Sequence, residues 1–143
     1  MKFGFDLDGV LLTQNNLHIA LVKGNKTLER LYYETLVPQL NPYLFMSIYD
    51  TAVIVTARSE EYFDITRKQC TKFFPAIPFY MVSTPQWTDT SQFSSWMKEV
   101  ARRKAAKLKD LEVDIYFEDL PETVLLLRDI CPDIAIVQYG GRI

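Results

Sequence analysis

The chain has 143 residues, 48% of them hydrophobic and 24% charged, with a formal net charge of −2. This length and composition are typical of one folded domain, here residues 1–143, and they exclude a disordered chain. A net charge this close to zero excludes a global field that would attract nucleic acid or an anionic membrane, and no apolar run is long enough to span a bilayer.

The cysteines bear on the cellular compartment. Cys70 and Cys131 lie far apart in the sequence, and their spacing is not typical of a metal site. We expect both to be reduced thiols in or near the core, which indicates a cytoplasmic protein. The sequence pattern leaves the oligomeric state open.

Apolar segments that are typical of strands alternate along the chain with amphipathic segments that are typical of helices. In chain order, strands are expected at 2–7, 52–57, 78–83, 113–119 and 133–139. Helices are expected at 25–40 (ending at Pro38), 41–50, 59–74, 93–111 and 121–131, and a loop at 84–92. This alternation predicts an α/β fold, in which a parallel sheet with right-handed crossovers has helices on its faces.

Two of these segments also predict what is buried. The helix within 25–40 is expected to bury the face formed by Leu28, Leu31, Tyr32 and Leu36. The run AVIVTA at 52–57 is apolar throughout and rich in β-branched residues, which indicates a strand buried on both faces.

Polar side chains lie at the ends of three of the five expected strands, where open parallel sheets bind ligands. They are Asp6 and Asp8 at the end of the first strand, Thr56 and then Arg58 at the end of the second, and Glu118 and Asp119 at the end of the fourth. Any one of these pairs alone is typical of a turn or a helix cap. Because all three follow apolar strands and meet at one edge of the sheet, together they indicate a site.

Carboxylates that converge on one crevice repel one another and therefore need a cation. Oxygen ligands without a nearby His or Cys favour a hard ion, and we expect Mg²⁺. A bound phosphate would meet one carboxylate that can attack phosphorus and form an aspartyl phosphate. A second carboxylate, two residues on, can protonate the leaving oxygen and then activate water. Thr56 supplies a hydroxyl for the phosphoryl oxygens.

Phosphoryl transfer also needs a fixed positive charge, and the helix at 93–111 is rich in basic residues. Lys104 falls on the apolar stripe of this helix, four residues from Val100 and four from Leu108. A salt bridge into the acidic crevice would explain a lysine at this place. Lys98 is the second candidate, and the other basic residues of the helix are expected to face solvent.

The sequence resembles one known family. The segments DLDGV at 6–10, VTA at 55–57 and YFEDLPE at 116–122, with a lysine on the helix before the last, resemble the four motifs of the haloacid dehalogenase-like (HAD) hydrolases. They occur in order over nearly the whole chain. The resemblance implies a three-layer, Rossmann-like parallel sheet whose five strands, numbered along the chain, have the order 5-4-1-2-3.

The same resemblance implies a role for each residue of the site. Asp6 would be the nucleophile and Asp8 the general acid and base, while Thr56 and Lys104 would hold the transferring phosphoryl group. The ligands of Mg²⁺ would be Asp6, the backbone carbonyl of Asp8, and Asp119, with Glu118 helping.

Substrate choice depends on what covers the site. Neither residues 10–51 nor the segment between the second and fourth strands has room for the full cap domain usual in this family, so we expect an open site. The chain is also loosely similar to the phosphatase domain of polynucleotide kinase-phosphatases and to 5′-nucleotidase-like members. Gly9, Ala57 and Arg58 would contact the substrate, which would be a phosphorylated small molecule or a nucleic-acid end.

A local basic patch would favour a nucleic-acid end as the substrate. Arg67, Lys68 and Lys72, together with the basic residues at 102–109, are the candidates for such a patch. Ordinary solvated helix faces are the simpler interpretation of these residues.

These observations predict a Mg²⁺-dependent phosphomonoester hydrolase that acts through an aspartyl phosphate. The alternative is a HAD-like binding module that is catalytically idle or is completed by a partner chain.

Overall fold

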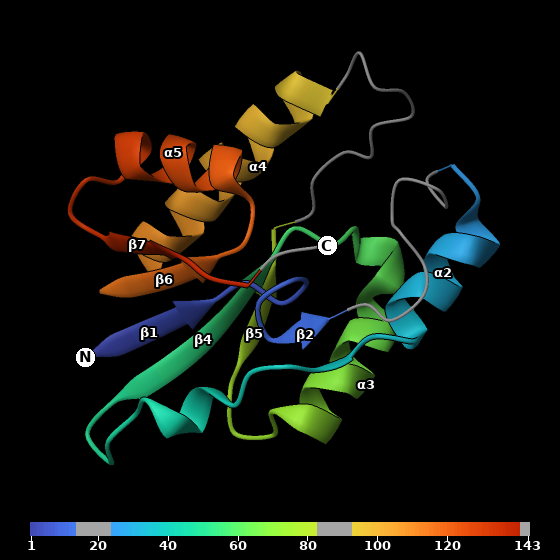
Figure 1. Ribbon diagram of the computed structural model, residues 1–143, viewed down its shortest axis with the longest axis horizontal. Helices are drawn as coiled ribbons and strands as arrows, with labels where there is room; N and C mark the ends of the chain where they lie inside the picture. The colour runs from blue at the N-terminus through green and yellow to red at the C-terminus, as the bar shows by residue number, and fades with distance from the viewer. Residues whose placement is uncertain (14–23, 83–92, 141–143) are drawn as a thin grey trace.

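The computed structural model describes residues 1–13, 24–82 and 93–140, so the loop expected at 84–92 lies outside the described residues (Figure 1). Five parallel strands form the main sheet in the order β5-β4-β1-β6-β7. Their bounds in chain order are β1 Lys2–Phe5, β4 Thr51–Thr56, β5 Phe79–Met81, β6 Ile115–Glu118 and β7 Ala135–Gln138. The predicted α/β class and strand order are therefore confirmed, with β1 in the centre of the sheet.

Helices cover both faces of the sheet and give the fold three layers (Figure 1). On one face lies α3 (Phe63–Phe73), which follows the 3₁₀ turn Glu60–Tyr62, with α2 (Lys26–Glu34) beside it. On the other face lie α4 (Phe93–Asp110) and α5 (Pro121–Ile130), which pack on each other.

The alternation of side chains along β4 divides the apolar core into two clusters. Ile54 packs in the cluster that includes Ile65 of α3, and Val53 and Val55 pack in the cluster that includes Ala105 of α4. Successive residues of a strand point to opposite faces, so a continuous apolar run is what a strand with helices on both faces requires. The prediction that β4 is buried on both faces is confirmed.

A glycine in the central strand allows an aromatic side chain to cross it. Gly4 of β1 is in register with Tyr116 of β6 on one side and with Val53 of β4 on the other. The Tyr116 hydroxyl donates to the Val55 carbonyl at 3.0 Å. A Cβ atom at Gly4 would lie 2.9 Å from Cδ1 of Tyr116. The absence of a side chain at Gly4 therefore makes room for the Tyr116 ring.

The segment between β1 and β4 differs from the sequence prediction. A helix was expected over 25–40 and a second helical segment over 41–50, but α2 ends at Glu34 and only the 3₁₀ turn Pro42–Leu44 follows. The chain at Val37–Pro38 (β3) instead pairs antiparallel with Leu12–Thr13 (β2). A residue before proline is driven to extended backbone, which explains why the helix cannot continue through Val37.

The buried face of α2 is also different from the predicted one. Tyr32 and Leu36 are buried as expected, but Leu28 and Leu31 are 37% and 45% exposed. Glu29 is buried instead, where its Oε2 accepts a hydrogen bond from the Tyr62 hydroxyl at 2.7 Å. The helix therefore faces α3 with a polar and aromatic surface, which a search for apolar periodicity does not find.

Two smaller expectations can be compared with the structure. Cys70 and Cys131 are both buried free thiols, in agreement with their expected place in the core. Within the part of the chain that the structure describes, no helix combines the length and the apolar content needed to cross a membrane.

Candidate functional site

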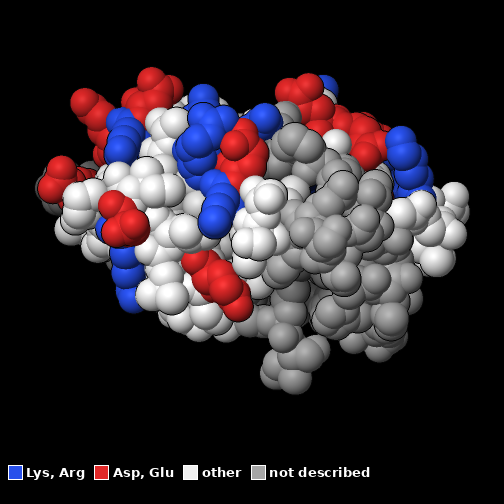
Figure 2. Space-filling model, turned by 90° about the horizontal axis from the view of Figure 1, so that it is seen from above, with Lys and Arg blue, Asp and Glu red and all other residues white. Residues whose placement is uncertain are grey.

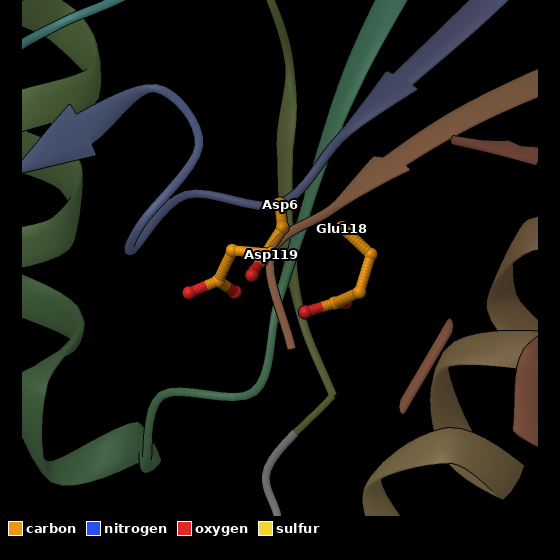
Figure 3. Close-up of side chains that lie close together, drawn as sticks. All are labelled: Asp6, Glu118 and Asp119. Atoms are coloured by element: carbon orange, nitrogen blue, oxygen red, sulfur yellow. The ribbon is translucent and has the colours of Figure 1, made fainter. Parts of the chain in front are cut away.

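Three acidic side chains meet where β1 and β6 end, at the carboxyl edge of the sheet (Figure 3). Asp6 follows β1, Glu118 is the last residue of β6, and Asp119 comes directly after it. All three are buried, and each offers a carboxylate oxygen that lies within 4.8 Å of the other two. The backbone N–H of Asp6 donates to the Phe117 carbonyl at 2.9 Å, which extends the pairing of β1 and β6 to the site itself.

Lys104 brings a positive charge into this acidic group from α4. Its Nζ lies 2.7 Å from Oε2 of Glu118 and 3.1 Å from Oδ1 of Asp6, and its side chain is 3% exposed. Lys98 lies on the same helix and is exposed. Of the two lysines that the sequence proposed for the site, the structure brings only Lys104 to the carboxylates.

The burial of these charges changes their proton affinities. Burial and the charge of Glu118 raise the pKa of Asp6 from 3.8 to about 7, although Lys104 acts in the opposite direction. Burial disfavours the charged form of Lys104, but Asp6 and Glu118 more than offset it, and the pKa of Lys104 is raised well above its usual value. The ammonium group therefore stays charged at neutral pH, and it does not fully compensate the carboxylates around it.

The donor set fits a hard divalent cation. Asp6, Glu118 and Asp119 offer oxygen atoms only, and such ligands suit Mg²⁺. Arg58 pairs with Asp8, so when Asp6, Glu118 and Asp119 are all ionised Lys104 alone faces them, which leaves an excess of two negative charges. A divalent cation would remove both this excess and the repulsion that raises the pKa of Asp6.

Asp8 does not join the other carboxylates, because it is bound to Arg58. The Arg58 Nε lies 2.9 Å from Oδ2 of Asp8, and one terminal nitrogen of the guanidinium lies 2.7 Å from Oδ1. The Arg58 side chain is only 1% exposed. Burial disfavours the charged form of Arg58, but the Asp8 carboxylate outweighs it and the pKa of Arg58 is raised.

The other positions proposed from the sequence surround this centre. Thr56 is buried at the end of β4, and its Oγ1 accepts a hydrogen bond from the Arg58 backbone N–H at 3.3 Å. Ala57 is half-buried. Gly9 has a φ of +88°, and a Cβ atom there would clash with Oδ2 of Asp119. Only glycine fits this turn, because it needs both positive φ and close approach of a site carboxylate.

Sequence reasoning missed two residues that hold the turn after β1. The side-chain amide of Gln39 donates to the Gly9 carbonyl at 2.6 Å and to the Val10 carbonyl at 2.9 Å. Gly140 lies against the same Gly9 carbonyl, and a Cβ atom at Gly140 would clash with it. Neither residue lies in a motif, and their roles follow only from the way the chain folds back on the turn.

The structure does not support a joint basic patch near the site. Arg67, Lys68 and Lys72 lie on α3, and the basic residues at 102–109 lie on α4, on the opposite face of the sheet (Figure 1). Arg102 and Arg103 also share the carboxylate of Glu99. Figure 2 shows basic and acidic side chains interspersed over the viewed face. Solvated helix faces are the interpretation that agrees with this arrangement.

Comparisons with known proteins add little to this geometry. The chain matches no protein-family model and no curated protein. Among solved structures it is similar to the C-terminal domain of a hydrogenase from Pyrococcus furiosus, with 13% identity and a TM-score of 0.46. That similarity covers 99% of this chain and 90% of the other. At this TM-score the similarity carries no conclusion about function.

Proposed function

We propose that this protein is a Mg²⁺-dependent phosphomonoester hydrolase that acts through an aspartyl phosphate on Asp6. The observation that carries the proposal is the contact of Lys104 with Asp6 and Glu118, beside Asp119, at the carboxyl edge of a five-stranded parallel sheet. The resemblance of four sequence motifs to those of HAD hydrolases supports the same reaction.

In the first step of the proposed reaction, an Asp6 carboxylate oxygen attacks phosphorus. The bond between phosphorus and the leaving oxygen breaks, and Asp8, which enters this step in its protonated form, gives its proton to that oxygen and becomes a carboxylate. In the second step, Asp8 takes a proton from water, the water oxygen attacks phosphorus, and inorganic phosphate and the Asp6 carboxylate are released.

The remaining groups of the site orient the phosphoryl group and balance its charge. Asp6, Glu118, Asp119 and the Asp8 carbonyl would hold Mg²⁺, which when bound supplies positive charge against the carboxylates and the phosphoryl oxygens. Lys104, which reaches the site from α4, would add a second positive charge beside Asp6. Thr56, at the end of β4, supplies a hydroxyl close to the start of the following turn.

The substrate class that we propose is a phosphomonoester, either a small molecule or the end of a nucleic acid. The preference for monoesters rests on the resemblance to the HAD hydrolases, in which a second aspartate at the position of Asp8 favours phosphatase activity. The interspersed charges on the face seen in Figure 2 favour a small molecule over a long nucleic acid, because a polyanion needs a continuous basic surface.

The test is phosphate release across a panel of substrates, with Mg²⁺ and with EDTA. The panel holds a chromogenic aryl phosphate, nucleoside 5′- and 3′-monophosphates, sugar phosphates and a 3′-phosphorylated oligonucleotide. We expect release that requires Mg²⁺ and is abolished in Asp6→Asn. Asp129→Asn, a matched change at an exposed aspartate of α5, is expected to retain full activity. Full activity of Asp6→Asn would show that the proposed mechanism is wrong.

The second candidate is a binding module that is idle or is completed by a partner. The observation that favours it is that both basic side chains of the site already contact carboxylates of the same site. A module of this kind is expected to gain thermal stability with Mg²⁺ while releasing no phosphate from any member of the panel.

A further inference from the structure

Arg58 is the most deeply buried basic side chain of the site, and its contacts are with the protein. Its Nε and one terminal nitrogen contact both oxygens of the Asp8 carboxylate, at 2.9 Å and 2.7 Å. A carboxylate held at both oxygens by a planar guanidinium has a fixed direction as well as a fixed position. A side chain that is 1% exposed presents no open donor to a substrate in this arrangement.

The guanidinium is itself held from α2 and α3. Its other terminal nitrogen donates to Oγ1 of Thr66 at 3.1 Å and to Oε1 of Gln69 at 2.7 Å. The carbon at its centre lies 4.5 Å from the centroid of the Tyr33 ring. Gln69 then donates to the Tyr33 carbonyl at 2.6 Å, which joins the two helices behind Arg58.

We propose that Arg58 is a positioning residue, which fixes the Asp8 carboxyl group for proton transfer and does not bind the substrate. This inference rests on the proposed function. It replaces the substrate contact that the sequence suggested for Arg58, because the guanidinium is buried and its nitrogens donate to Asp8, Thr66 and Gln69. It also makes α3 and the inserted helix α2 the support of the proposed acid and base.

A positioning role through Asp8 has a consequence that direct phosphate binding lacks. A poor leaving group, such as an alkoxide, needs a proton as it departs, whereas a nitrophenolate departs without one. Loss of Arg58 should therefore slow the cleavage of an alkyl phosphate much more than that of a nitrophenyl phosphate. A residue that holds the phosphoryl group, or that only stabilises the fold, would affect both substrates equally.

The experiment measures kcat/KM for an alkyl phosphate and for p-nitrophenyl phosphate, with Mg²⁺, in the wild type and in Arg58→Lys. Lysine keeps the charge but cannot contact both carboxylate oxygens as a planar fork. We expect a loss of about 100-fold for the alkyl phosphate, the scale of a misplaced catalytic group. For the nitrophenyl ester we expect a loss of less than about threefold, because its leaving group needs no proton.

Two further variants make the test independent of folding. Arg103→Lys changes a half-buried arginine paired with Glu99 on α4 and is expected to leave both rates unchanged. Gln69→Met removes one acceptor of the Arg58 guanidinium and is expected to give the same substrate pattern with a smaller loss. If Arg58→Lys does not fold, the pattern in Gln69→Met decides.

The outcomes separate this inference from the proposed function. Equal losses on both substrates, or a higher KM at unchanged kcat, would overturn the positioning role while leaving a phosphatase in place. In an Asp8→Asn background, Arg58→Lys should cost the alkyl phosphate little more, and a full additional loss would also overturn it. A wild-type protein without Mg²⁺-dependent release would overturn both proposals.

Discussion

Lys104 supplies the positive charge that lies between the carboxylates of Asp6 and Glu118. Replacing it by methionine, which keeps much of the volume, would leave two buried carboxylates side by side without a cation. Breaking a buried ion pair from one side destabilises a protein by about 3 kcal/mol or more. Because the proposed function gives the same charge a role at the phosphoryl group, we expect Lys104→Met also to lower kcat about 100-fold. Urea unfolding in EDTA and steady-state kinetics with Mg²⁺ measure the two effects.

Lys98 is the matched control, because it lies on the same helix and is exposed. Lys98→Met is expected to change neither the free energy of unfolding by more than about 0.5 kcal/mol nor the rate. Equal effects of the two substitutions would mean that the contact of Lys104 with the carboxylates has no energetic weight.

How far single residues could be predicted depends on how local their roles are. Asp6 and Asp119 directly follow apolar strands and Thr56 ends one, so the place of each at the carboxyl edge of the sheet could be predicted from the chain alone. The partner of Arg58 could not, because its contacts join α2, α3 and the turn after β1 across long sequence separations. A sequence motif predicts the backbone position of such a residue but not the charged partner of its side chain.

Among the elements, the packing of β1 against β6 depends on Gly4. A methyl group there would meet Cδ1 of Tyr116 and Cγ1 of Val113 at 2.9 and 3.1 Å. Tyr116 is fully buried and its hydroxyl is bonded to Val55, so the ring has little freedom to move away. We expect Gly4→Ala to lower the free energy of unfolding by about 1–3 kcal/mol, the usual cost of overpacking a core. Urea unfolding measures this change.

A second substitution distinguishes this steric contact with Tyr116 from an effect of alanine on the backbone conformation at position 4. Tyr116→Leu removes the ring that Gly4 accommodates, so alanine at position 4 should cost clearly less in that background, where only the contact with Val113 remains tight. Strict additivity of the two substitutions would contradict the contact between Gly4 and Tyr116 as the cause.

The elements differ in how well their sequences predict them. Strand β4 could be predicted because a run buried on both faces needs nothing but apolar side chains. Helix α2 could not be oriented correctly, since its buried face includes Glu29 and two tyrosines. Glu29 accepts a hydrogen bond from Tyr62, and the Tyr33 ring packs at a tilt against the Tyr62 ring, directly before α3. The antiparallel pair of β2 and β3 was not predicted, because strands of two residues have no measurable alternation.

For the molecule as a whole, the strand order, which only the family resemblance predicted, brings acids at the ends of β1 and β6 into one buried group. This arrangement stores repulsion in the metal-free fold. Because the folded pKa of Asp6 is about 7 and its ordinary value is 3.8, the folded state holds this proton more tightly than the unfolded chain does. The contribution is fully present below about pH 4 and is lost as the pH rises through about 7.

The metal-free wild type should therefore lose stability relative to Asp6→Asn as the pH rises from about 4 to about 7, by more than about 1 kcal/mol. Asparagine does not titrate, so the pH dependence of Asp6→Asn comes from the other titrating groups. The difference between the two proteins therefore reports on Asp6. Urea unfolding in EDTA across this range measures the difference. Addition of Mg²⁺ at about pH 8 should stabilise the wild type, by about 2.7 kcal/mol at a hundredfold excess over Kd, and should stabilise Asp6→Asn much less. A difference between the two proteins that stays constant with pH would mean that Asp6 is not strained in the metal-free fold, and an equal response to Mg²⁺ would place the ion elsewhere.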